Sequence, residues 1–86
     1  MRERIRLDTM KDIENFVNIM SEINKDVYLE DETGLKVSAK SILGALYTME
    51  WNHIYCCCDI DISGKIINFI IWLYFYRKGD IFGINL

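Results

Sequence analysis

Apolar and polar residues alternate with a period of two in several short segments of this chain. Residues 3–7 place Ile5 and Leu7 on one face and charged residues on the other. The pattern recurs in three further segments, residues 27–30, 35–39 and 53–59. Alternation of this kind is typical of half-buried strands. We therefore expect four strands, and the turn residues at 31–34 predict that the second and third form a hairpin.

Two segments between the strands have a helical period instead. Thr9 and Asp12 approximate a capping box, and the apolar residues after them recur every three or four positions: Ile13, Phe16, Val17, Met20 and Ile23. A second helix is predicted from Ser41, its N-cap, to about Asn52. The strands and helices together predict an α+β domain.

The longest apolar stretch, residues 66–76, predicts a last helix that is capped by Asp61 or Ser63. It is too short to span a bilayer, which needs about 20 residues. As a helix it would be apolar almost all round and would leave an unpacked face made of Phe69, Trp72, Phe75 and Tyr76. Contiguous exposed aromatic residues mark interfaces, so this face is a candidate homo-oligomer contact. Equally, the apolar tail at residues 79–86 is able to fold back and cover it.

The composition limits the class of protein. The chain has 86 residues, of which 27% are charged and 51% apolar, with a net charge of -3. This length predicts a single domain over residues 1–86. The acidic balance argues against nucleic acid as a partner. No segment has the basic start, apolar stretch and cleavage site of a signal peptide, so we expect a cytoplasmic protein with no membrane span.

Three consecutive cysteines lie in the fourth predicted strand. Cys56 and Cys58 would face one side, roughly 7 Å apart along the chain, which is poor geometry for a disulfide. His53 would share the face of Cys57 but lie roughly 13 Å away, too far for both to bind one metal ion. We therefore expect free thiols in a reducing compartment, with no metal and no cofactor.

Residues 37–44 read Val-Ser-Ala-Lys-Ser-Ile-Leu-Gly and change from strand to helix at Ser41. With the segments around it, over residues 3–74, this stretch resembles the HPr family, the histidine-containing phosphocarriers of the bacterial sugar phosphotransferase system. The strongest part of the resemblance is Val37, Lys40, Ser41, Ile42 and Gly44 at their observed spacing.

The predicted order of elements is βαββαβα, with a mainly antiparallel sheet and helices on one face. Two architectures share its first six elements, the ferredoxin-like sheet and the HPr open-faced β-sandwich. The local pattern leaves both open. The resemblance implies the HPr-like fold, with strand order 1-4-2-3 and three helices on one face of the sheet.

The resemblance is broken at the family's phosphorylation site. Where the family has a Gly-Leu-His-Ala-Arg-Pro type motif, residues 7–12 read Leu-Asp-Thr-Met-Lys-Asp. Thr9 takes the place of the histidine, Lys11 that of the arginine and Asp12 that of the proline. A threonine hydroxyl without an adjacent base is a poor nucleophile, and Asp12 adds negative charge where phosphate would sit. We expect no phosphocarrier activity, and since no other catalytic set is present, no enzyme.

His53, the only histidine, is a candidate surrogate for the missing one. If the fourth strand runs antiparallel beside the first, His53 approaches the vacated site at Thr9. It would not lie at a helix N-terminus there. The alternative is an ordinary surface histidine at the start of a strand.

Ser41 is the candidate regulatory phosphosite. In Gram-positive relatives a dedicated HPr kinase phosphorylates the matching serine, and the product binds a transcription regulator; one branch keeps only this serine. Free amides at a helix start stabilise a phosphate, and Lys40 would help. The expected partner surface consists of Lys40, Ile42, Leu43 and Tyr47. The alternative is that Ser41 is an N-cap and nothing more.

These observations predict a non-catalytic, HPr-like protein that regulates sugar uptake or carbon use, through phosphorylation of Ser41. Its partners would be HPr kinase, a transcription regulator or other phosphotransferase proteins. The alternative is a degenerate HPr fold that serves as a structural or oligomerisation module with no phosphotransfer role.

Overall fold

A computed structural model describes residues 1–71 of the chain and shows an α+β fold. In chain order its elements are β1 (Arg2–Ile5), α1 (Met10–Ser21), β2 (Val27–Glu30), β3 (Lys36–Ser38), α2 (Ile42–Tyr47), the 3₁₀ turn η1 (Thr48–Glu50) and β4 (Ile54–Cys58). The four predicted strands and the first two predicted helices are thus confirmed, with bounds that differ by a few residues. Within this part of the chain, no helix is long and apolar enough to cross a membrane.

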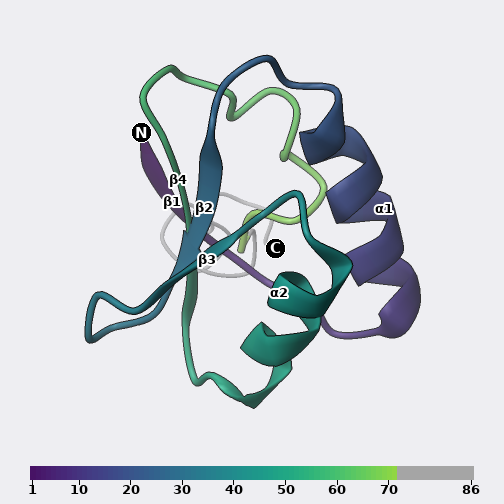
Figure 1. Cartoon of the computed structure of the whole chain (residues 1–86), viewed down its shortest axis with the longest axis vertical. Coiled ribbons are helices and arrows are strands. Elements are labelled where there is room, and N and C mark those ends of the chain that lie inside the picture. Colours follow the sequence, from purple (N-terminus) through teal and green to yellow (C-terminus); the bar gives the residue numbers. More distant parts are fainter. Residues whose placement is uncertain (72–86) are drawn as a thin grey trace, which may run out of the picture.

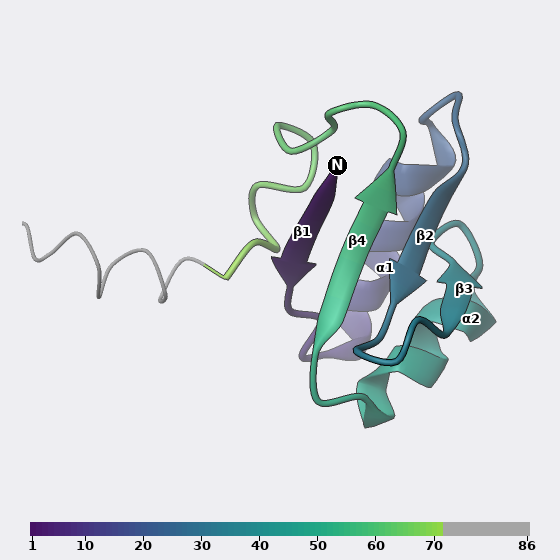
Figure 2. The same cartoon turned by 90° about the vertical axis from the view of Figure 1, so that its left-hand side faces the viewer.

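The four strands form one antiparallel sheet in the order β1-β4-β2-β3, which is the expected order 1-4-2-3. Leu29 of β2 lies opposite Cys56 of β4 and Val37 of β3, so β4 and β2 are the central strands. Figure 1 shows the sheet nearly edge-on, with both α-helices on one side of it. In the turned view of Figure 2 the helices lie behind the sheet.

The core lies between the sheet and the two helices. Each strand turns alternate side chains toward the helices, and Ile5, Leu29 and Cys56 are buried there. The helical period of α1 brings four apolar side chains onto this layer: Ile13, Phe16, Val17 and Met20. The periodicity of the sequence therefore accounts for most of the core.

The prediction of a third helix is wrong within residues 61–71. The N–H groups of Lys65 and Phe69 donate to carbonyls three residues earlier, at 2.8 Å each, and form separate turns rather than a helix. Asp61 caps no helix, because its carboxylate accepts hydrogen bonds from the N–H and hydroxyl of Ser63 at 2.9 and 2.6 Å. Residues 72–76 of the predicted helix and the predicted tail at 79–86 lie outside the described residues.

Residues 60–71 are here called the strap, and the end of the strap, residues 69–71, pairs instead with the outer edge of β1. The N–H of Arg6 donates to the carbonyl of Phe69 at 2.8 Å, and the N–H of Ile71 donates to the carbonyl of Arg4 at 3.4 Å. An uncovered edge strand leaves such groups without protein partners. Pairing with this edge, favoured by the β-branched isoleucines of the strap, replaces the helix.

The strap also completes the core at this edge. Ile62, Ile66 and Phe69 are buried, and the ring of Phe69 packs edge-on against that of Phe16, with 5.3 Å between centroids. The strap is thus attached to the domain both by its backbone and by its apolar side chains.

Candidate functional site

The segment that carries the resemblance joins β3 to α2. Ser41 is the N-cap of α2, as predicted, and its side-chain oxygen accepts a hydrogen bond from the N–H of Gly44 at 3.1 Å. The carbonyl of Ser41 accepts the first helical bond, from Ala45, at 2.9 Å. The residue is partly exposed. Its cap function is therefore established by geometry.

Gly44 lets α2 approach β3 closely. A Cβ atom at this position would lie 2.9 Å from the carbonyl oxygen of Ser38, closer than a side chain tolerates, and 3.4 Å from the Cβ of Val37. The sequence marked Gly44 only as part of the resemblance. Its physical role is to seat the start of α2 against the strand.

Lys40 does not extend toward an open phosphate position. Its Nζ donates to the carbonyl of Ile23, just after α1, at 2.6 Å. The ammonium therefore ties the end of α1 to the start of α2. A phosphate on Ser41 would have to compete with this bond for the charge of Lys40.

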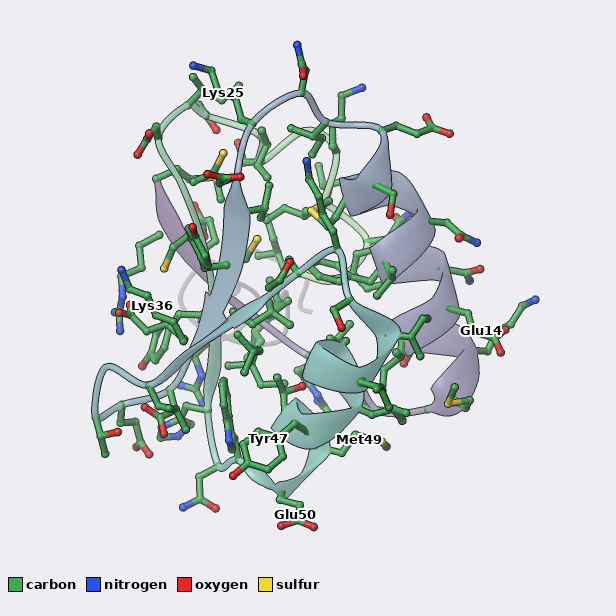
Figure 3. All side chains as sticks on the ribbon, in the orientation of Figure 1. Glu14, Lys25, Lys36, Tyr47, Met49 and Glu50 are labelled. Carbon is green, nitrogen blue, oxygen red and sulfur yellow. The ribbon has the colours of Figure 1, made fainter. Side chains whose placement is uncertain are left out.

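An exposed apolar cluster begins directly after Ser41. We call it the α2 surface and define it as Ile42, Leu43, Tyr47 and Met49, all exposed large side chains. Leu43 is 79% exposed. Figure 3 shows Tyr47 and Met49 at the end of the molecule that α2 and η1 form. The sequence predicted the first three of these residues as a partner surface but did not predict Met49, which lies within the second predicted helix.

Beside this cluster, the ring of Tyr47 packs edge-on against that of Trp51, with 6.2 Å between centroids. Trp51 is only partly exposed and packs against the core. The α2 surface is therefore continuous with the core through an aromatic pair.

At the start of α1, the carboxylate of Asp12 accepts backbone hydrogen bonds. Thr9 is the N-cap, and its side-chain oxygen accepts from the N–H of Asp12 at 3.1 Å. In return, Oδ2 of Asp12 accepts from the N–H groups of Asp8 and Thr9, at 3.0 and 3.2 Å. This is the predicted capping box. Two amides beside Thr9 thus already have a carboxylate as acceptor, and exposed Lys11 makes no ion pair within residues 1–71.

His53 lies just before β4, near the end of β1, as the antiparallel pairing predicts. Its Nδ1 is 2.6 Å from Oε2 of Glu32, in the turn between β2 and β3. Within the described part of the chain no polar contact joins His53 to Thr9. The structure therefore places the imidazole in a pair with Glu32 rather than at the start of α1.

The aromatic residues that were predicted to form an oligomer contact are not a single exposed face. Phe69 is buried against Phe16 in the same chain, which corrects its assignment as an exposed interface residue. The other three, Trp72, Phe75 and Tyr76, lie outside the described residues.

The three cysteines are free thiols. Cys56 and Cys58 face the core, and Cys57 lies on the other face of the sheet beside Glu30 and Arg2. Burial raises the pKa of the Cys56 thiol to about 12, which makes it a poor nucleophile and a poor metal ligand near neutral pH. Residues 1–71 contain no group of three or more potential ligands that could hold a metal ion.

The comparisons with known proteins found no relative. No family model, no curated protein and no solved structure matches this chain.

Proposed function

We propose that this protein is a non-catalytic, HPr-like binding protein that regulates partners in sugar uptake or carbon use through its α2 surface. One observation carries the proposal: four exposed apolar side chains, among them Leu43 at 79% exposure, follow Ser41 along α2 and η1. Contiguous apolar side chains on the surface of a small domain mark binding sites. The strand order 1-4-2-3, with both helices on one face, supports the HPr-like fold that the sequence resemblance implies.

We further propose that phosphorylation of Ser41 regulates this surface. The N–H groups of Ile42 and Leu43, in the first turn of α2, have no acceptor within residues 1–71. A phosphate on Ser41 would accept from such amides and would add about 1.5 to 2 negative charges at the rim of an apolar surface. That change selects between partners, because a basic rim on the partner then favours binding and an acidic one opposes it.

The start of α1 supports a binding role over a phosphocarrier role. Asp12 accepts from the amides of Asp8 and Thr9, so its carboxylate lies beside Thr9 and would repel a phosphoryl group there. Within residues 1–71 no hydrogen bond joins the Thr9 hydroxyl to a histidine or a carboxylate that could act as a base, because the Asp12 carboxylate accepts from the N–H of Thr9 instead.

The first experiment tests Ser41 as the modified residue. Purified protein is incubated with HPr kinase and ATP and is then analysed by mass spectrometry, with Ser41→Ala and Ser38→Ala as matched variants. We expect one phosphate in the wild type and in Ser38→Ala, and none in Ser41→Ala. Labelling that persists in Ser41→Ala, or no labelling of the wild type, would remove phosphorylation at Ser41 from the proposal.

A second experiment tests the α2 surface as the contact. Binding of the phosphorylated protein to a catabolite-control transcription regulator is measured by calorimetry for the wild type, Leu43→Gln and Ile60→Gln. Both positions carry an exposed aliphatic side chain, but Ile60 lies outside the α2 surface. We expect Leu43→Gln to weaken binding tenfold or more, about 1.4 kcal/mol, and Ile60→Gln to leave it unchanged. Equal effects of the two variants would refute docking through α2.

The alternative, an oligomerisation module, is tested with the same variants. Sedimentation at micromolar concentration is expected to show a monomer. A dimer that Leu43→Gln dissociates and Ile60→Gln does not would assign the α2 surface to a second copy of the chain instead of to a regulatory partner.

A further inference from the structure

A hollow of about 240 Å³ lies at the end of the β1–β4 pair, and its polar lining is Arg4, Arg6, Asn52 and His53. We propose that this hollow, here called the Arg4–His53 hollow, is a binding site for a small free oxyanion of the phosphate type. It shares no residue with the α2 surface, although its lining residue Trp51 packs against Tyr47, and the inference does not depend on the function proposed above.

The sheet brings the two arginines and the histidine to one place. Arg4 of β1 lies opposite Tyr55 of β4, and Ile5 lies opposite Ile54. Arg6 follows Ile5 on one strand, and His53 precedes Ile54 on the other. The antiparallel register therefore sets Arg6 and His53 beside each other. Residues that are far apart in sequence thus line one hollow.

Of the two guanidinium groups in the hollow, that of Arg6 has a carboxylate partner and that of Arg4 has none within residues 1–71. The guanidinium of Arg6 pairs with Asp8 at 3.1 Å, and both side chains are more than half exposed. Arg4 is exposed, and its guanidinium has no carboxylate partner within residues 1–71. Among residues 1–71, no carboxylate lines the hollow itself; Asp8 and Glu32 adjoin it only through their pairs with Arg6 and His53. A planar guanidinium with free N–H groups is the side chain that best matches an oxyanion.

The imidazole of His53 is a further polar group in this lining. Its Nδ1 is held by Oε2 of Glu32 at 2.6 Å, which fixes the ring and leaves Nε2 without a partner within the described residues. When protonated, the ring donates from both nitrogens, one to Glu32 and one to a bound anion. The amide of Asn52, at the same rim, is a neutral donor.

Two other hollows of this chain lack these properties. A neighbouring one of about 210 Å³ is lined by the carboxylates Asp8 and Asp12, which repel an anion. A third, of about 440 Å³, sets Asp26 and Asp59 against its two cationic side chains. At about 240 Å³, the Arg4–His53 hollow is smaller than the pockets of about 300 to 1,000 Å³ that hold drug-sized ligands, and this size suits phosphate or a small phosphate ester.

The test uses inorganic phosphate and nuclear magnetic resonance of the full chain. Because the chain has one histidine, its imidazole Cε1–H resonance reports on His53 alone. Phosphate is titrated against chloride at constant pH and ionic strength, for the wild type, Arg4→Gln, Arg4→Lys and Lys36→Gln. Lys36 is the matched control, because it is a cation on the same face of the sheet but on β3, at the opposite edge, without an ion pair within residues 1–71 (Figure 3).

We expect a saturable shift with phosphate and none with chloride. Arg4→Gln is expected to raise the dissociation constant for phosphate about tenfold, because one charge-assisted hydrogen bond is lost. Arg4→Lys should raise the dissociation constant less, and Lys36→Gln should leave it unchanged. Arg4 is exposed, so these variants keep the fold, which circular dichroism verifies. A shift that does not saturate, that chloride reproduces, or that Arg4→Gln and Lys36→Gln weaken equally would overturn the site.

Discussion

Replacing Phe69 by alanine tests whether the strap is part of the folded core. In the structure this ring is 8% exposed and packs edge-on against Phe16 at 5.3 Å. As part of a helix over residues 66–76, the same ring would belong to the unpacked aromatic face. The two arrangements therefore predict opposite costs for the same substitution.

The cost follows from the buried area. A phenyl ring buries about 150 to 200 Å², which at about 25 cal/mol per Å² corresponds to about 4 kcal/mol. A compact denatured state reduces this to about 3 kcal/mol, at the lower end of the range for Phe→Ala in cores. With a urea m-value of about 1 to 1.5 kcal/mol per M for a domain of this size, the midpoint of unfolding should fall by about 2 M or more.

The assay is urea unfolding of the full chain, followed by circular dichroism, with Ile60→Ala as the control in the same strap. Ile60 is 45% exposed, so its truncation should cost less than about 0.5 kcal/mol. A double-mutant cycle with Phe16→Leu and Phe69→Leu should show a coupling of about 0.5 to 1.5 kcal/mol. If Phe69→Ala is no more harmful than Ile60→Ala, the strap does not pack as described.

Four further outcomes follow from the local contacts. Ser41→Ala should lower the free energy of unfolding by about 1 kcal/mol in urea titrations, whereas Ser41→Asp, which also caps, should not. A thiol reagent should modify Cys57 before Cys56 in peptide mass maps of the native protein. Since burial raises the pKa of Cys56 to about 12, its contribution to stability is complete below the unfolded value near pH 8.5 and should be lost as the pH rises toward 12. A hydrogen bond from Arg2 holds the pKa of Glu30 below its usual value. The pair therefore stabilises the fold above about pH 4.3, and this stabilisation is lost as the pH falls. Arg2→Gln should make the urea midpoint less sensitive to acid.

Local sequence signals predicted the elements whose structure depends on nearby residues. The alternation around Ile5 and the two caps, Thr9 and Ser41, are short-range features, and the structure confirms them. The strand order could not be predicted from the local pattern alone, since this pattern also fitted a ferredoxin-like sheet. The resemblance supplied the order that the structure shows.

The strap could not be predicted in the same way, because its structure depends on distant residues. The run of isoleucines has a helical period, yet the hydrogen-bonding groups of Arg4 and Arg6 at the edge of β1 give it an extended partner. No local sequence pattern predicts that the strap pairs with the edge of β1. The pairing of His53 with Glu32 likewise depends on the register of the sheet, so the sequence showed the histidine but not its neighbour.

The position of β1 has a consequence for the order in which this protein can be assembled. The first strand of the chain pairs with β4 on one side and with the end of the strap on the other, so both of its neighbours are made last. The β2–β3 hairpin and α1 are local and can form while the chain is still growing. During synthesis, β1 therefore cannot pair until nearly all of the described chain has left the ribosome. We expect the closure of the long loop between β1 and β4 to set the folding rate.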